Sequence, residues 1–301
     1  MRIKEPYDIR DERFSAIVMG NVDLHQLTDE CAWAEGPVFF GDGNYLLWSD
    51  IPTNRILRWI PGVGTSVFRA DSGNSNGHTR DNDGRLVSCE HRNRRVSRTE
   101  YSGAVTVLAD RFEGKRLNSP NDVIVRRDGS VWFTDPSYGI LSEYEGDQAE
   151  PEQPCRGVYR IDPTGRIDRV VDDFNQPNGL AFSPDERILY IADSGASHDG
   201  SLPRHIRAFD VSEDGKLSNG RVFCEIVDAG IPDGIRVDTT GRLWSSAKDG
   251  VHCFSPEGTL LGKILVPETV ANLTFGGRKK NQLFIAATRS IYSIYVNAEG
   301  A

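Results

Sequence analysis

Oxygen-bearing side chains recur at one kind of position along this chain, directly before short apolar stretches. Glu35 precedes Gly-Pro-Val-Phe, Asn121 precedes Asp-Val-Ile-Val, Asn178 precedes Gly-Leu-Ala-Phe, and Asp233 precedes Gly-Ile-Arg-Val. Carboxylate and amide oxygens are the ligands that hard divalent cations prefer. Two carboxylates would also balance the charge of one dication and leave positions open for water and substrate. If the fold brings these four side chains together, they would form a cation site.

The Asn-Gly and Asp-Gly dipeptides at these positions have an ordinary alternative explanation, because such pairs are common in hairpin turns. Two features favour the ligand interpretation. The dipeptides precede the first apolar stretch of each unit, whereas a separate turn follows that stretch, as at residues 81–84 and 238–241. In addition, Glu35-Gly-Pro and Asn121-Asp occupy the same register and are poor type I′ turns.

The pattern occurs six times, which predicts a repeated fold. The six units start at Glu35, Asn76, Asn121, Asn178, Asp233 and Asn272. Each unit continues with a turn, a second strand-like stretch such as 130–135 and a third such as 157–162. The starts lie about 40 to 60 residues apart, close to the period of β-propeller blades with four strands each.

Units one to five carry a fourth strand-like stretch, whereas the chain ends soon after the third stretch of unit six. We expect residues 22–33 to supply the missing strand. The prediction is an all-β fold, a six-bladed β-propeller closed by an N-terminal strand in the last blade. Residues 1–20 would form an N-terminal extension, and residues 21–301 a single propeller domain. Helical periodicity is nearly absent, which disfavours a doubly wound α/β fold, and a two-domain β-sandwich would not explain six starts in one register.

In a propeller the first strand of each blade is innermost, so the six starts should converge at one mouth of the central channel. The second strands end on the same face, which places Glu90 and Asp135 near the rim. We therefore expect Asn121, Asp135, His78 and Glu90 to contact a substrate. Asp135 has an alternative role as a cap of the turn before Pro136, and a lone His is often a satisfied surface residue.

The ring of start residues contains no Cys and no His. This composition favours Ca²⁺, Mg²⁺ or Mn²⁺ over a thiolate-type zinc site. We expect one divalent cation at Glu35, Asn121, Asn178 and Asp233, with Ca²⁺ as the first choice and Mg²⁺, Mn²⁺ or Zn²⁺ as alternatives.

Four segments, AEGPVF, NSPNDVIV, QPNGLAFSPD and IPDGIRVDTTGRLW, resemble the metal-site segments of the senescence-marker-protein/gluconolactonase/luciferin-regenerating-enzyme family. The resemblance spans roughly residues 24–295 in the same order. It implies a six-bladed propeller and a divalent ion held by Glu35, Asn178 and Asp233, with Asn121 at or near the metal. The stretches VSCEHRNRRVSR and VWFTDPSYG look closer to the bacterial gluconolactonases. Ser119 stands where the animal sugar lactonases have Arg, so the substrate contacts of those enzymes cannot be carried over.

The ligand set and the resemblance together predict a gluconolactonase-like enzyme, which hydrolyses a sugar lactone with the help of a metal ion. The ion would polarise the lactone carbonyl and stabilise the developing oxyanion, while Asp233 acts as general base toward the attacking water. Two alternatives stay open. One is hydrolysis of another ester or of an organophosphate on the same site, and the other is a non-enzymatic binding propeller.

Composition narrows the range of partners. The 301 residues carry a formal net charge of −9 and no Lys/Arg run, so we expect no nucleic-acid partner. No apolar run is long enough to span a membrane, and the charged N-terminus differs from a signal peptide, so we expect a cytoplasmic protein without a membrane partner. Five scattered cysteines without a CxxC indicate reduced thiols. The particular lactone, the oligomeric state and the roles of the insertions at 141–156 and 195–205 stay open.

Overall fold

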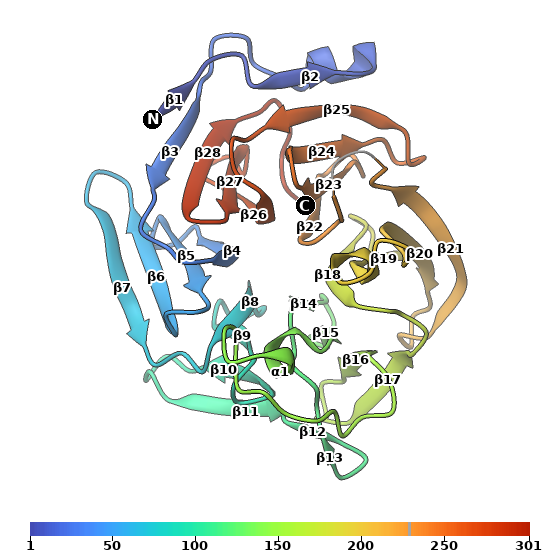
Figure 1. Cartoon of the computed structure of the whole chain (residues 1–301). Helices are drawn as coiled ribbons and strands as arrows, with labels where there is room; N and C mark the ends of the chain where they lie inside the picture. The colour runs from blue at the N-terminus through green and yellow to red at the C-terminus, as the bar shows by residue number, and fades with distance from the viewer. Residues whose placement is uncertain (228–229) are drawn as a thin grey trace.

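The computed structural model describes residues 1–227 and 230–301, which form six antiparallel sheets around a central axis (Figure 1). Each sheet is a meander in which consecutive strands pair, so each predicted unit folds as one blade. Blade one contains β4 (Ala34–Phe40), β5 (Tyr45–Asp50), β6 (Arg55–Ile60) and β7 (Gly64–Ala70). Blade two contains β8 (Ser75–Arg80), β9 (Leu86–Glu90), β10 (Arg95–Thr99) and β11 (Val105–Ala109). Blade three contains β14 (Val123–Val125), β15 (Val131–Asp135), β16 (Gly157–Ile161) and β17 (Ile167–Val171).

The other three blades complete the circle. Blade four contains β18 (Pro177–Phe182), β19 (Ile188–Asp193), β20 (His205–Val211) and β21 (Leu217–Glu225). Blade five contains β22 (Ile235–Val237), β23 (Leu243–Ala247), β24 (Gly250–Phe254) and β25 (Leu260–Leu265). Blade six contains β26 (Val270–Gly276), β27 (Gln282–Ala287), β28 (Ser290–Tyr295) and β3 (Leu24–Thr28). The innermost strands contact one another around the ring, in the order β4, β8, β14, β18, β22, β26 and back to β4. The prediction of a six-bladed all-β propeller is therefore confirmed.

Blade six is closed by a strand from the other end of the chain, as predicted from residues 22–33. β3 pairs antiparallel with β28, and Tyr292 lies opposite Gln26 in this pairing. The chain before β3 adds two further edge strands: β1 (Arg2–Ile3) pairs with β3, and β2 (Tyr7–Ile9) pairs with β25 of blade five. These short strands cover outer edges that would otherwise present unpaired backbone groups. The division of the chain at residue 20 stays a prediction.

The core lies between the blades, where the middle strands present large apolar side chains to the neighbouring sheet. Trp48, Trp132 and Trp244 are fully buried in second strands. Trp244 of blade five, for example, packs in one cluster with Leu273 and Leu283 of blade six. These tryptophans therefore stabilise the contacts between blades, which hold the inner strands in place.

Little helix is present. The short elements are η1 (Glu12–Ala16), α1 (Tyr138–Leu141), η2 (Gly195–Ser197) and a hairpin of β12 (Arg111–Phe112) with β13 (Lys115–Arg116). No helix in the described residues is both long and apolar enough to cross a membrane. All five cysteines are free, as expected.

Candidate active site at the channel mouth

The start residues lie where the inner strands begin, and most of the Gly residues that follow them are not in hairpin turns. β4, β8 and β18 each contain a register shift at the start residue, between Glu35 and Val38, between Ser75 and His78, and between Pro177 and Leu180. Such a bulge re-aims the side chain at this position. These dipeptides are therefore not hairpin turns in the structure, and their role as ligands stays a prediction.

The glycines after the start residues allow neighbouring inner strands to approach closely. Gly77 donates its backbone N–H to the carbonyl of Asn121 at 2.8 Å, and Gly179 donates to the carbonyl of Asp233 at 3.1 Å. A Cβ at Gly179 would collide with that same Asp233 carbonyl. A side chain there would push the strands apart, so Gly is required for the backbone of one blade to position the start residue of the next.

A chain of polar contacts links Glu35 to the interior of the channel. Glu35 is 3% exposed, and its Oε2 accepts hydrogen bonds from the backbone of Gly36 at 2.5 Å and from Asn272 Nδ2 at 3.0 Å. The same Asn272 Nδ2 lies 3.5 Å from Asp122 Oδ2, which lies 3.7 Å from Arg236 Nη1. Asn272, the start residue of blade six, thus connects two buried carboxylates.

Three carboxylates face one another at this mouth. Burial, together with the charge of Asp122, raises the pKa of Glu35 to about 8, against the lowering effect of its hydrogen bonds from Gly36 and Asn272. Burial also raises the pKa of Asp233 well above its usual range, with further increases from Glu35 and Asp122 and an opposing effect from Asn178. The pKa of Asp122 is raised by burial and lowered by Arg236. A bound cation would reverse these shifts, since it stabilises the charged form of each acid.

The two remaining predicted ligands are both buried. Asn178 lies close to Asp233 and to Tyr138, whose pKa it lowers slightly against the larger effect of burial. Asn121 is 5% exposed, and its backbone is held by Thr134 and Gly77. Asp233 is more exposed than the other ring members, which are all buried. The structure thus brings Glu35, Asn178 and Asp233 together and places Asn121 on the adjoining blade.

The predicted substrate contacts occupy other surroundings. His78 is fully buried, with one ring nitrogen 2.8 Å from Ser49 Oγ and the other 2.8 Å from Ser88 Oγ, and burial lowers its pKa to about 3. The Glu90 carboxylate accepts hydrogen bonds from Asn93, Ser97 and Arg95. Both side chains therefore have hydrogen-bond partners within the protein, His78 from blades one and two and Glu90 from blade two, and their contact with a substrate stays a prediction.

Asp135 belongs to a structural pattern that recurs in three blades. Asp50, Asp135 and Asp193 each end a second strand and accept backbone N–H groups from the segment that leads into the inner strand of the same blade. Asp135 Oδ2 accepts from Asn118 at 2.8 Å, three residues before Asn121. Its Oδ1 has no hydrogen-bond partner in the described residues, and burial raises its pKa to about 7. Substrate contact by Asp135 stays a prediction, but its position shows a capping role.

Two insertions meet above the site. Tyr138 in α1 and Ser197 in η2 share a hydrogen bond between their hydroxyl groups, with the two oxygens 3.1 Å apart, and the Tyr138 ring lies 5.5 Å from that of His198. Glu145 Oε2 lies 3.9 Å from Nδ1 of the buried His91, and burial raises the pKa of Glu145 to about 6. Glu145 also raises the pKa of Asp233. The insertions therefore contribute groups to the site itself.

Comparison with known proteins agrees with this arrangement. Residues 33–289 match the family described as SMP-30/Gluconolactonase/LRE-like region. The chain belongs to this family. A gluconolactonase from Zymomonas mobilis is 33% identical over an alignment of 312 positions, which covers 96% of this chain and 85% of the relative. A pentonolactonase from Haloferax volcanii is 31% identical over 85% of this chain and 81% of its own length.

Family members of known structure share the whole fold. The structure of a gluconolactonase from Xanthomonas campestris superposes with a TM-score of 0.90 at 38% sequence identity, covering 98% of this chain and 97% of that one. The resemblance to the SMP-30/gluconolactonase family that the four sequence segments indicate is thus confirmed over nearly the full length.

The residues at the mouth fit the divalent cation that the resemblance implies. No Lys or Arg in the described parts of the chain forms an ion pair with Glu35 or Asp233, whereas Asp122 has Arg236. Two uncompensated carboxylates match the charge of one dication. Nowhere among residues 1–227 and 230–301 do three or more His, Cys, Asp or Glu side chains form a group suited to a metal. A cation at this mouth would therefore also need neutral oxygen ligands, such as the amide oxygens of Asn178 and Asn121.

Sequence reasoning did not assign a role to Asp122, Arg236, Tyr138 or Glu145. Asp122 occupies the position at which four of the other five units have Gly, and this substitution was a usable signal. Glu145 gave no such signal, because it lies in the insertion at 141–156, which has no register with the other units, and Tyr138 lies just before that insertion.

Asp193 offers a direct test of the capping pattern. Its carboxylate accepts backbone N–H groups of Gln176 at 2.9 Å, Asn175 at 3.1 Å and Gly195 at 3.1 Å. We expect Asp193→Ala to lower the free energy of unfolding by about 3 kcal/mol or more, since three N–H groups lose a charged acceptor. Urea unfolding measures this change.

A matched control for this substitution is Glu213→Ala in the exposed turn between β20 and β21 of the same blade, with an expected change within about 0.5 kcal/mol. If both variants unfold at the same urea concentration, Asp193 does not act as a structural cap.

Proposed function

We propose that this chain is a metal-dependent sugar lactonase with its catalytic centre at the channel mouth. The observation that carries the proposal is the pair of uncompensated carboxylates, Glu35 and Asp233, beside Asn178 in a propeller of the gluconolactonase family. The gluconolactonase and pentonolactonase names of its relatives support lactones of sugar acids as the substrate class.

The cation would be held by Glu35, Asn178 and Asp233. Asn121 would lie in its first or second coordination shell. The cation, which we propose is Ca²⁺ with Mg²⁺, Mn²⁺ and Zn²⁺ as alternatives, would supply polarisation of the lactone carbonyl. Glu35 is buried and hydrogen-bonded to Gly36 and Asn272, so it serves as the rigid anchor.

Asp233 is the residue proposed to move the proton. It is the more exposed of the two acids, so water and substrate can reach it. In the reaction, the water oxygen forms a bond to the carbonyl carbon while the Asp233 carboxylate accepts the water proton. The bond between the carbonyl carbon and the ring oxygen then breaks, the ring oxygen takes up a proton, and the product is an open-chain sugar acid. Asn121 orients the substrate hydroxyls.

The experiment that tests the proposal combines a substrate panel with metal removal. We expect turnover of aldonolactones to exceed that of an aryl ester and of a phosphofluoridate, to disappear on chelation and to return when Ca²⁺ is added. Elemental analysis of the purified protein should find one divalent ion per chain. Preference for the ester or the phosphofluoridate would favour another hydrolase on the same site. Absence of both metal and chelator-sensitive turnover would favour a binding propeller.

A further inference from the structure

The other end of the central channel holds a cavity of about 340 Å³. It is lined by residues at the carboxyl ends of the inner strands, namely Thr79, Val125, Phe182, Val237 and Phe275. Glu35 and Asn178 lie at the amino ends of the same set of strands. The cavity is therefore at the mouth opposite the candidate active site, and its volume is in the lower range of small-molecule sites.

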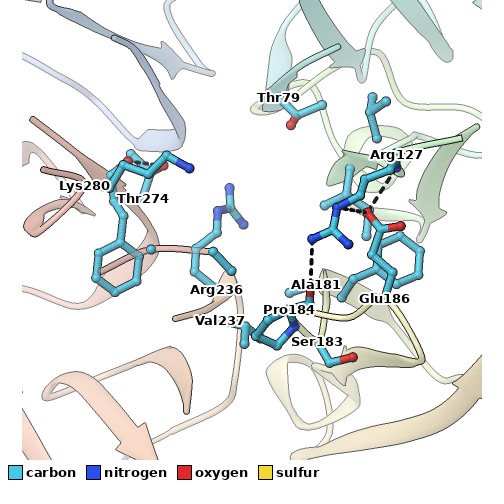
Figure 2. A pocket seen from close by; sticks show the side chains of 16 residues that line it. Thr79, Arg127, Ala181, Ser183, Pro184, Glu186, Arg236, Val237, Thr274 and Lys280 are labelled. Carbon is cyan, nitrogen blue, oxygen red and sulfur yellow. Dashed lines mark hydrogen bonds and ion pairs between the residues drawn. The ribbon is translucent and has the colours of Figure 1, made fainter. Parts of the chain in front are cut away.

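Cations from three different blades surround this cavity. Arg127 comes from the turn of blade three, Arg236 from β22 of blade five and Lys280 from the turn of blade six. Figure 2 shows Lys280 on one side, Arg127 and Glu186 on the other, and Arg236 between them. Glu186 is the only acidic side chain among the described lining residues. This local excess of positive charge contrasts with the formal net charge of −9 for the whole chain.

The protein uses only some of the donors of these cations, among them Arg127 Nη2, which donates to the carbonyl of Pro184 at 2.7 Å. Lys280 is exposed and forms no ion pair in the described residues. Arg127 is also largely exposed, and its one acidic partner, Glu186, lies 3.8 Å away and is shared with Arg126 at 3.5 Å.

Arg236 connects the cavity to the polar contacts of the channel. Its Nη1 donates to the carbonyl of Ile235 at 2.7 Å and lies 3.7 Å from Asp122 Oδ2. Within the described residues its other nitrogens donate no hydrogen bond, and its side chain is 18% exposed. A partly buried guanidinium with free donors is well suited to bind an oxyanion, because charge-assisted hydrogen bonds are strong there.

We propose that this cavity is a second ligand site, which binds one small oxyanion through Arg127, Arg236 and Lys280. The shared chemistry is a carboxylate or phosphate group, with two sources: a free phosphate or the carboxylate of a sugar acid. Arg236 would then contact both the bound anion and Asp122. Asp122 is in turn linked through Asn272 to Glu35 at the opposite mouth.

The test is calorimetric titration of chelated protein at constant ionic strength, with inorganic phosphate in one arm and gluconate in the other. Chelation leaves the carboxylates at the opposite mouth uncompensated, so they repel both probes. We expect one anion to bind per chain, and Arg127→Gln and Lys280→Gln each to weaken binding about tenfold. Lys279→Gln is the matched control, because it removes the same charge from the same exposed turn without lining the cavity.

Binding of phosphate alone, of gluconate alone or of both supports the site and identifies the source of the oxyanion. Two results would overturn the proposal: no heat of binding for either probe up to about 10 mM, a concentration far above the affinity that three cations should give, or binding that Arg127→Gln and Lys280→Gln leave unchanged. Because these measurements need neither metal nor turnover, they stand apart from the proposed lactonase activity.

Discussion

Replacing Asp233 with Asn is expected to lower kcat on a sugar lactone by roughly 10²–10⁴-fold, the usual cost of losing a general base. Asn keeps an oxygen that can contact the cation but cannot accept a proton from water. The substitution also removes one of three mutually repelling carboxylates, so the fold should not suffer. The measurement is kcat at saturating metal, corrected for spontaneous opening of the lactone.

The control for Asp233→Asn is the affinity of the variant for Ca²⁺, which shows whether the assay is performed on loaded enzyme. If the loaded variant turns over within a few-fold of the parent, Asp233 is only a ligand. Water activated by the cation alone would then be the nucleophile.

Replacing Glu35 with Gln is expected to weaken Ca²⁺ binding by roughly 10²-fold or more, because a buried charge would lose its partner. Glu35 is buried and paired with no Lys or Arg in the described residues, so its negative charge is available to the cation. Asn178→Ala removes a neutral oxygen from the same site and should weaken binding only about tenfold. Calorimetric titration of the two variants with Ca²⁺ makes the comparison.

A second measurement on Glu35→Gln has the opposite sign. In chelated protein above about pH 8, where Glu35 is ionised, we expect this variant to unfold at a higher temperature than the parent, since a neutral amide removes repulsion among Glu35, Asp122 and Asp233. Equal Ca²⁺ affinity in parent and variant, together with an unchanged unfolding temperature in chelator, would show that Glu35 neither binds the cation nor belongs to a strained acidic cluster.

The polar chain from Glu35 to Arg236 gives the channel a physical connection between its two mouths. Asn272 donates from one nitrogen toward both Glu35 and Asp122, so displacement of Asp122 changes how Glu35 is held. Arg236 neutralises Asp122 from the other side. This arrangement leaves Glu35 and Asp233, the two acids proposed to bind the cation, as the uncompensated pair.

Much of the architecture could be predicted from the sequence because a propeller blade is a local unit. Its strands pair with their neighbours in the chain, so each blade leaves its own period, turn and start residue in the sequence. The positions of Glu35, Asn178 and Asp233 follow from this repetition, since equivalent residues of a ring must lie at equivalent heights. The missing fourth strand of unit six likewise predicted the pairing of β3 with β28.

Contacts between blades and insertions were decided only by the tertiary structure. In the sequence, Asn272 is only one of six start residues. The fold shows that it lies between Glu35 and Asp122. Asp135 looked equally suited to substrate or turn, and only its hydrogen bond from Asn118 showed that it caps the entry to β14. Tyr138 and Glu145 lie in loops without a period, and Arg127 and Lys280 meet at one cavity only because the ring closes. Side chains brought together by ring closure share no spacing in the sequence, so no local pattern could have revealed them.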